Sequence, residues 1–374
     1  MRSLVRLLTA VVVNYRSAAL AAGCVASLRR EAADAGVPLE VVVVDNSAEP
    51  QERSLLGAIE GVRYHPLARN AGYAGGLNAG VGTATGDVLL LANPDLVFPP
   101  GSLPPLLRAL EMPNAGAAGP RFTWDEEGRW LLPPLWIPTP AEEVAKILAR
   151  SRLAWGAGLR KAWHAVALPQ WEASVPTAVP GLVGALVAVP RDVWARVGPF
   201  DERYPLFYED TDWSVRLARE GLSAILVPAS RVTHLHGQST ARSSERSLAS
   251  FLVSEQRYFD VHFSGAARAL RRAAGALLPP ADGRGVPVAH RPLRLEWNTR
   301  GRALVELTTV PEGAPAAGRF VEEGFFDLAG ADWERLPAGP VYLRVTQRES
   351  GKVVASAALW KDEPVSPSPA GGRA

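Results

Sequence analysis

Cysteine is almost absent from this chain of 374 residues, in which Cys24 is the single one. A lone cysteine excludes a disulfide framework and any metal site built from several cysteines. Its spacing from Leu20 and Leu28 indicates one face of a helix, so we interpret it as a small core residue. The net charge is also small, at +2, which argues against nucleic acid as the main partner.

Long apolar runs are missing too. No window approaches eighteen consecutive apolar residues, so we expect no membrane-spanning helix. The amino terminus imitates a secretory signal, since Arg2 and Arg6 precede an apolar stretch that ends near Cys24. However, residues 14–16 (Asn-Tyr-Arg) interrupt that stretch, and a secretory apolar region would not hold an arginine there. We therefore expect a mature cytoplasmic chain, with peripheral contact at the inner face of the cell membrane left open.

Several catalytic signatures are missing as well. The sequence has no Walker loop, no Rossmann glycine fingerprint, no Gly-x-Ser-x-Gly elbow and no His-Glu-x-x-His metal motif. Nothing therefore points to a hydrolase. The lack of a basic glycine-rich loop near the amino terminus disfavours a nucleotidyltransferase.

The chain has instead short apolar runs that alternate with helical segments. The apolar runs predict buried strands at 7–13, 39–44 and from Leu89 onward. Strands that alternate with helices predict an α/β fold with a mostly parallel sheet and right-handed crossovers. Ligands bind such sheets at the carboxyl ends of the strands. Asp95 follows the strand that begins at Leu89, so it is a candidate functional carboxylate, with a plain strand-ending turn as the alternative.

Composition divides the chain into three predicted parts. Residues 1–280 form the α/β domain, in which 113–175 is an irregular insertion rich in tryptophan and proline. A basic amphipathic helix near 141–163 fits either packing over the sheet edge or contact with a membrane surface. Short alternating strands predict a small β-sandwich module over 286–361. Residues 362–374, rich in Pro, Ser and Gly, are predicted to be disordered.

Three acids crowd the start of a predicted helix, at Glu209, Asp210 and Asp212. Capping by Asp210 or Asp212 explains one carboxylate, and Asp212 can pair with Arg216 one turn later. Mutual repulsion among the three acids would be relieved by a cation or by the hydroxyl protons of an acceptor. The pattern therefore favours a functional site over a purely structural one.

Two further segments carry polar groups that could bind a ligand. A glycine-rich run over residues 70–80 contains Asn70 and Asn78. Its glycines allow close approach of the backbone to a ligand, and a plain turn before a helix is the equal alternative. His234 and His236 follow another predicted strand. Either is a natural further ligand if a carboxylate holds a divalent metal, and a solvated or core histidine otherwise.

Six segments of the chain carry the next inference. They are VVVNYRS (11–17), VVVVDNSAE (41–49), NAGYAGGLNAG (70–80), GDVLLLANPDL (86–96), VGPFDERYPLFYEDTDWSVRL (197–217) and VTHLHGQS (232–239). Taken together and in this order, they resemble the bacterial family 2 glycosyltransferases of GT-A fold, and among them the rhamnosyltransferase-like branch of cell-surface polysaccharide assembly. Each segment alone is a weak signal, but six in order across residues 7–262 are specific. The family implies transfer of a sugar from a nucleotide diphosphate to an acceptor hydroxyl, with inversion.

The resemblance also implies roles for single residues near the acidic cluster. Asp210 would be the general base. Glu209, Asp212 and Trp213 would hold the acceptor or orient the loop.

A second set of roles concerns the donor and a metal. Asp95 and His234 would hold Mg²⁺ or Mn²⁺, with His236 the weaker candidate. The donor would be a dTDP-, UDP- or GDP-linked sugar, and the acceptor a lipid-linked glycan or a polysaccharide. The nucleotide sugar would be lined by Asn14, Asp45, Asn70, Gly72, Asn78 and Asn93.

The chain departs from the family pattern at three points. The metal motif often reads Asp-x-Asp, but Asn93 takes its first position here and leaves one carboxylate. There is no Gln-x-x-Arg-Trp, so we do not expect a processive synthase. The module over 286–361 lies outside the core pattern, and carbohydrate binding, oligomerisation and bracing of the catalytic domain all remain open for it. A non-catalytic nucleotide-sugar-binding or scaffold protein is the alternative, which Asp95, Asp210 and His234 argue against.

Overall fold

The computed structural model describes residues 6–151, 156–235, 244–277, 293–310, 313–322, 324–336 and 338–361. The chain divides into two compact units. The first contains Met1–Glu143 and His164–Ala273, and the second contains Val144–Trp163 and Ala274–Ala374. The first unit covers most of the domain predicted over 1–280, but residues 144–163 are grouped with the C-terminal unit. The predicted tail over 362–374 lies outside the described residues.

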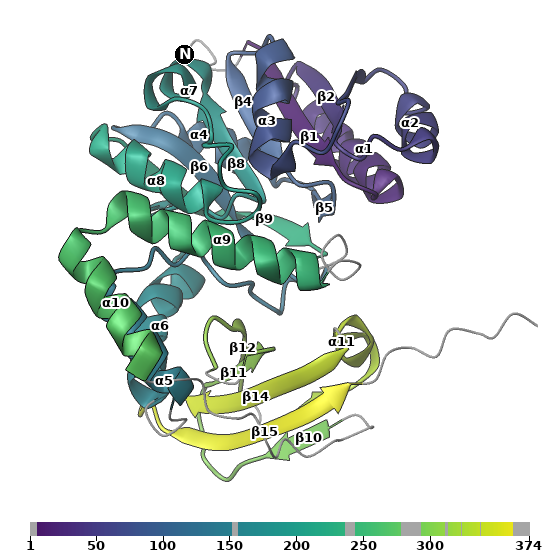
Figure 1. The fold of residues 1–374 in the computed structure, drawn as a ribbon. Helices are drawn as coiled ribbons and strands as arrows, with labels where there is room; N and C mark the ends of the chain where they lie inside the picture. Colours follow the sequence, from purple (N-terminus) through teal and green to yellow (C-terminus); the bar gives the residue numbers. More distant parts are fainter. Residues whose placement is uncertain are drawn as a thin grey trace, which may run out of the picture. The chain divides into compact units, whose positions relative to one another are not determined.

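One nine-stranded sheet forms the centre of the first unit (Figure 1). Four neighbouring strands at one side run parallel, the fifth runs against both of its neighbours, and the next two are parallel to each other. The predicted α/β fold with a mostly parallel sheet is confirmed. In spatial order the strands are β3 (Arg63–Pro66), β2 (Leu39–Asp45), β1 (Leu8–Asn14), β4 (Val88–Ala92), β8 (Leu186–Pro190), β6 (Ala115–Thr123), β9 (Ser223–His234) and β5 (Leu96–Val97), with β7 (Thr177–Val179) paired to β9.

Helices cover both faces of this sheet, because its central strands are apolar on both sides. Leu8 and Val12 of β1 belong to one core cluster and Val11 and Val13 to another. Cys24 is buried in the first cluster, which confirms it as a core residue. The first face packs against α1 (Ala18–Asp34), α2 (Pro50–Gly57) and α4 (Leu103–Ala109), and the second against α3 (Gly72–Thr83), α7 (Arg191–Val197) and α8 (Glu209–Arg219).

Most of the glycine-rich run over residues 70–80 is helical and forms the start of α3. A Cβ at Gly76 would lie 2.7 Å from Cγ1 of Val13, and one at Gly80 would overlap Val11. The small residues therefore let the helix approach the sheet closely. Helix packing explains these two glycines, so neither a ligand loop nor a plain turn accounts for them.

The carboxyl ends of the parallel strands meet at one edge. Asn14 at the end of β1 is opposite Asp45 at the end of β2. Ala92 at the end of β4 is opposite Val12 of β1, and it is also opposite Leu186, where the antiparallel β8 begins. This edge is where ligands bind in open α/β sheets.

The segment over 113–175 was predicted to be irregular, and that prediction is wrong. It contains β6 and two helices, α5 (Pro140–Ser151) and α6 (Gly156–Glu172). The helix predicted near 141–163 corresponds to α5 and the start of α6. The abundant tryptophan reflects burial, since Trp124, Trp163 and Trp171 are all buried.

Two more helices follow, α9 (Ser244–His262) in the first unit and α10 (Gly265–Leu277), which begins in the first unit and ends in the second. Within the described parts of the chain, no helix has the length and hydropathy of a membrane span.

The C-terminal unit is mainly antiparallel. Its four-stranded sheet has the order β12 (Ala317–Val321), β11 (Ala303–Thr308), β14 (Gly339–Gln347), β15 (Val353–Lys361). A second sheet pairs β10 (Leu293–Glu296) with β13 (Phe325–Leu328), and α11 (Gly330–Arg335) follows. Short alternating strands are present as predicted, and the sandwich arrangement stays a prediction.

Candidate active site

Two short pairings bring Asp95 and His234 together at the edge of the sheet. Leu96 of β5 is opposite His234 at the end of β9, and the N–H of Leu235 donates to the carbonyl of Asp95 at 3.0 Å. As a result, Nε2 of His234 lies 3.2 Å from Oδ1 of Asp95. Both side chains are buried. His236, the weaker predicted ligand, lies outside the described residues.

This pair is the part of the site suited to a metal ion. One carboxylate and one imidazole are donors that Mg²⁺ and Mn²⁺ accept. Among the described residues there is no group of three His, Cys, Asp or Glu side chains that could hold an ion. The donor set of Asp95 and His234 fits a cation that takes further ligands from outside this pair, as Mg²⁺ usually does from water and phosphate.

Asp210 lies against a loop at the same edge of the sheet. Its Oδ2 accepts the N–H of Gly184 at 2.8 Å, and its Oδ1 accepts the N–H of Thr211 at 2.6 Å. The neighbouring residue Ala185 accepts the N–H of Asn93 at 2.8 Å. Because adjacent residues of one loop carry these bonds, Asp210 and the strand end that leads into Asp95 meet there.

Gly184 is required at this position for steric reasons. A Cβ added to it would lie 2.9 Å from Cβ of Asp210 and 3.1 Å from its Oδ2. Any larger residue would therefore push the carboxylate away from its backbone donor. The signal that could have revealed this role is a glycine within an apolar run of the sequence, a position that often marks close approach of another group.

Tyr73 of α3 is a site residue that the sequence did not single out. Its hydroxyl donates to the carbonyl of Gly184 at 2.9 Å. Burial raises the pKa of Tyr73 well above its ordinary value, and the nearby carboxylates of Glu209, Asp210 and Asp95 raise it further. The tyrosine thus lies among these three acids as a neutral hydrogen-bond donor.

The two adjacent acids differ in how their charges are stabilised. Burial raises the pKa of Asp210, but its backbone donors and the Thr211 hydroxyl favour the ionised form. Burial also raises the pKa of Glu209 to about 8, with the charge of Asp210 as the second cause. Oε2 of Glu209 is buried without a hydrogen-bond partner. The charge of Asp210 thus has hydrogen-bond donors that stabilise it, whereas the buried Oε2 of Glu209 has none within the described part of the chain.

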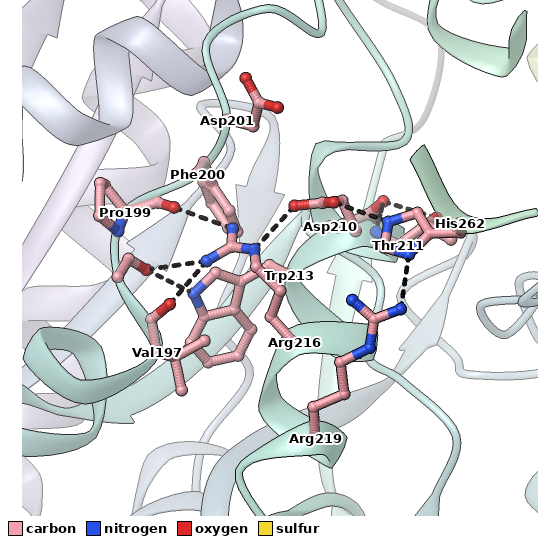
Figure 2. Close-up of polar contacts among 12 residues, drawn as sticks. Val197, Pro199, Phe200, Asp201, Asp210, Thr211, Trp213, Arg216, Arg219 and His262 are labelled. Atoms are coloured by element: carbon pink, nitrogen blue, oxygen red, sulfur yellow. Dashed lines mark hydrogen bonds and ion pairs between the residues drawn. The ribbon is translucent and has the colours of Figure 1, made fainter. Parts of the chain in front are cut away.

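Arg216, which pairs with Asp212, and Trp213 hold the loop that precedes the acidic cluster (Figure 2). Oδ2 of Asp212 accepts Nε of Arg216 at 2.8 Å, which confirms the predicted pair. Arg216 also donates to the carbonyls of Val197 and Pro199, each at 2.8 Å. Nε1 of Trp213 donates to the carbonyl of Gly198, which lies between these two residues, at 3.0 Å. These contacts orient residues 197–199.

The second oxygen of Asp212 is engaged as well. His262 of α9 places Nε2 2.8 Å from Oδ1 of Asp212. Although burial opposes it, hydrogen bonds from His262 and Arg216 hold the pKa of Asp212 below its ordinary value. Both oxygens are thus occupied by side chains of the protein, which favours loop orientation over acceptor binding for this residue.

A strained turn positions Glu209 and Asp210. Phe207 and Tyr208 both have left-handed backbone conformations, with φ of 67° and 66°. Such conformations are costly for bulky residues, and they gather at functional sites. The predicted capping by an acid is wrong, because Tyr208 is the N-cap residue and no side chain caps the helix. The turn instead places the carboxylates within the first turn of α8.

A buried ionic network holds this turn in place. The hydroxyl of Tyr208 donates to Oε1 of Glu255 at 3.3 Å. Arg271 of α10 donates to Oε2 of Glu255 at 2.8 Å and to Oε1 of Glu143 at 3.2 Å. Both glutamates are buried. These long-range supports left no motif in the sequence.

Two predicted nucleotide-binding side chains stand at the ends of β1 and β2. Asp45 accepts the hydroxyl of Ser47 at 2.5 Å and that of Tyr64 at 2.8 Å. Asn14 accepts the hydroxyl of Ser17 at 2.9 Å and donates to Glu52 at 2.8 Å. The structure brings them together at the predicted edge, and their contact with a nucleotide stays a prediction.

Three more predicted nucleotide ligands lie around α3, whereas Asn93 directly follows β4. Oδ1 of Asn70 accepts the N–H of Gly72 at 2.8 Å, and Gly72 has a left-handed φ of 76°. Asn46, which the sequence did not single out, donates to the carbonyl of Gly72 at 2.9 Å. Asn78 donates to the carbonyl of Phe200 at 2.9 Å and accepts its N–H at 3.1 Å. These amides support the fold, and their nucleotide contacts stay predictions.

The sequence comparisons agree with this geometry. Residues 9–158 match the profile of glycosyl transferase family 2. This part of the chain belongs to the family 2 glycosyltransferases. The N-acetylglucosaminyl-diphospho-decaprenol L-rhamnosyltransferase of Mycobacterium tuberculosis is 29% identical over 238 residues, with the same figures for two strains. The alignment covers 57% of this glycosyltransferase and 71% of that relative.

Two solved glycosyltransferases are partly similar in structure. The mannosyltransferase PcManGT from Pyrobaculum calidifontis, in complex with GDP-Man and Mn²⁺, has a TM-score of 0.41 and 18% identity, over 73% of this chain and 80% of that chain. GalNAc-T7 with UDP, GalNAc and Mn²⁺ has a TM-score of 0.45 and 14% identity, over 93% and 77%. Both TM-scores lie below 0.5.

Proposed function

We propose that this glycosyltransferase moves a sugar from a dTDP-, UDP- or GDP-linked donor to an acceptor hydroxyl, with inversion. One observation carries the proposal: the same loop contacts Asp210 and the strand end that leads into Asp95, and Asp95 in turn lies beside His234. A base beside a diphosphate-binding edge is what a single in-line displacement needs. The similarity to a rhamnosyltransferase supports rhamnose as the first donor sugar to test.

The acceptor that we propose is a lipid-linked glycan or a polysaccharide. The similar mycobacterial enzyme is named for a decaprenol-linked substrate, which supports a lipid-linked acceptor. We further propose that the enzyme reaches this acceptor as a peripheral protein at the inner face of the cell membrane.

Asp210 would act as the general base. The acceptor oxygen attacks the anomeric carbon while its proton passes to the Asp210 carboxylate. The bond between that carbon and the diphosphate oxygen breaks, and the nucleoside diphosphate leaves. Each carboxylate oxygen has two lone pairs, so both can accept a proton while they keep their backbone donors. A carboxylate is too weak to deprotonate a free hydroxyl, so proton transfer accompanies late bond formation.

Asp95 and His234 would hold Mg²⁺ or Mn²⁺ at the edge of the sheet. When bound, such a cation neutralises the negative charge of a leaving diphosphate. Tyr73 would keep Gly184, and through it Asp210, in place, since its hydroxyl donates to that glycine.

A donor panel tests the proposal. The full chain would be heated with dTDP-rhamnose, UDP-linked and GDP-linked sugars, with and without Mn²⁺, because a ligand that binds the folded state raises the melting temperature. The donors that bind would then be incubated with lipid-linked acceptors, and release of nucleoside diphosphate would be measured. We expect one donor class to bind and to turn over. Binding without turnover of any donor would favour the non-catalytic alternative.

A further inference from the structure

One face of the four-stranded sheet in the C-terminal unit carries a groove lined by polar side chains. Residues directly opposite each other in an antiparallel sheet share a face. Across β11, β14 and β15, one row is Glu306, Arg344 and Ser356, and the next is Thr308, Tyr342 and Ala358. These rows line a groove of ≈ 580 Å³, which lies in the usual size range of ligand sites.

Two guanidinium groups share this groove with one buried carboxylate. Arg344 donates to Oε2 of Glu306 at 3.1 Å and to the carbonyl of Gly313 at 3.0 Å. Arg160 lines the groove from the part of α6 that belongs to the same unit. It has no hydrogen-bond or ion-pair partner within the described ranges of the chain. Burial lowers the pKa of Arg160 and the nearby charge of Arg344 lowers it further, while the carboxylate of Glu306 raises it.

This arrangement favours an anionic ligand. Two guanidinium groups face one carboxylate, since Glu306 pairs with Arg344 and also attracts Arg160, so the described residues that line the groove carry one excess positive charge. A carboxylate or phosphate group placed against Arg160 would relieve its repulsion with Arg344, and guanidinium groups bind both anions with paired hydrogen bonds.

Aromatic side chains extend the same face. Trp360 is opposite Pro340, two residues beyond the pairing of Tyr342 with Ala358, so its side chain shares the face of Tyr342. Trp360 is 45% exposed, which is unusual for so large an apolar side chain. Tyrosine and tryptophan offer flat apolar surface with a polar tip, and this combination suits a sugar ring with its apolar face and hydroxyl edges.

We propose that this groove binds an acidic saccharide. The anionic group, a carboxylate or a phosphate, lies between Arg160 and Arg344. The sugar ring packs across Tyr342 and Trp360, and its hydroxyls bond to polar side chains such as Ser356. The proposal goes beyond the transfer reaction, because it assigns a second glycan contact whose residues are distinct from those around Asp210.

Calorimetric titration of the full chain tests this proposal. The probes are oligogalacturonate, which carries carboxylates, glucose 6-phosphate, inorganic phosphate and neutral maltotetraose. The wild type is expected to bind one of the two acidic sugars at least about tenfold more tightly than the neutral sugar or phosphate alone. Arg160→Gln is expected to weaken this binding by about tenfold or more, because the anion loses its partner. The preferred probe tells whether the anion is a carboxylate or a phosphate.

Lys161→Gln is the matched control, since Lys161 is the next residue on α6, is exposed and does not line the groove. It should bind like the wild type. Trp360→Ala should weaken binding of the acidic sugar but leave binding of inorganic phosphate unchanged. The proposal is overturned if the wild type binds neither acidic sugar, if maltotetraose or phosphate alone binds equally well, or if Arg160→Gln and Lys161→Gln behave alike.

Discussion

Replacing Glu209 by glutamine is expected to change how the stability of the fold depends on pH. The pKa of Glu209 is raised from 4.5 to about 8, chiefly by burial. A raised pKa means that the folded state holds the proton more tightly than the unfolded state. The wild type is therefore fully stabilised below the ordinary pKa, and it loses stability as the pH rises toward 8. Glutamine stays neutral over this whole pH range, so the Glu209→Gln variant does not lose stability in this way.

The size of the effect follows from the shift. Each pKa unit corresponds to about 1.4 kcal/mol, so between about pH 5 and pH 7.5 the wild type should lose up to about 3 kcal/mol relative to Glu209→Gln. Urea unfolding of both proteins at these two pH values measures the difference. Glu60→Gln, which alters an exposed carboxyl, should follow the wild type. Parallel pH profiles for the wild type and Glu209→Gln would refute the reasoning.

Three further changes probe the edge of the sheet and the loop before α8. In turnover assays across Mn²⁺ concentrations, Asp95→Ala should be less active than the wild type, and a rising Mn²⁺ concentration should restore only part of the lost activity. Full activity at the Mn²⁺ concentration that saturates the wild type would show that this acid does not hold the metal. Gly184→Ala should lower kcat by about tenfold or more, because its Cβ would displace Asp210. Gly23→Ala, in open space on α1, is its control and should leave kcat unchanged. Arg216→Met should lower the free energy of unfolding by about 2–4 kcal/mol in urea titrations, because it leaves buried Asp212 with one partner; a change below about 0.5 kcal/mol would contradict this.

The central sheet was largely predictable from the sequence, because the signal for it is local. Apolar runs such as 39–44 and the run from Leu89 can be buried only as central strands, and β2 and β4 lie there. The pair of Asp212 and Arg216 was also predictable, since residues four apart are neighbours on any helix. Placing Asp95 at the carboxyl end of a strand needed only the polar residues that follow β4.

The support around Asp210 was not predictable in this way. Tyr73, Gly184 and Glu255 reach the acidic cluster across long stretches of chain, and their contacts depend on how α3, the loop before β8 and α9 pack. Tryptophan and proline also misled the prediction for 113–175, because Trp163 and Trp171 are buried anchors of a helix. The sequence also did not show that the amide of Asn78 ties α3 to Phe200, and its role as a nucleotide ligand stays a prediction.

Turnover by Asp210→Asn tests the central claim most directly. The variant keeps the shape of the side chain but removes the base, so release of nucleoside diphosphate from a sugar donor should fall by about 100-fold or more. Donor binding, measured by thermal shift, should survive. Asp34→Asn, which alters an exposed carboxyl at the end of α1, should retain wild-type turnover. Near-full turnover by Asp210→Asn with a bound donor would contradict the account.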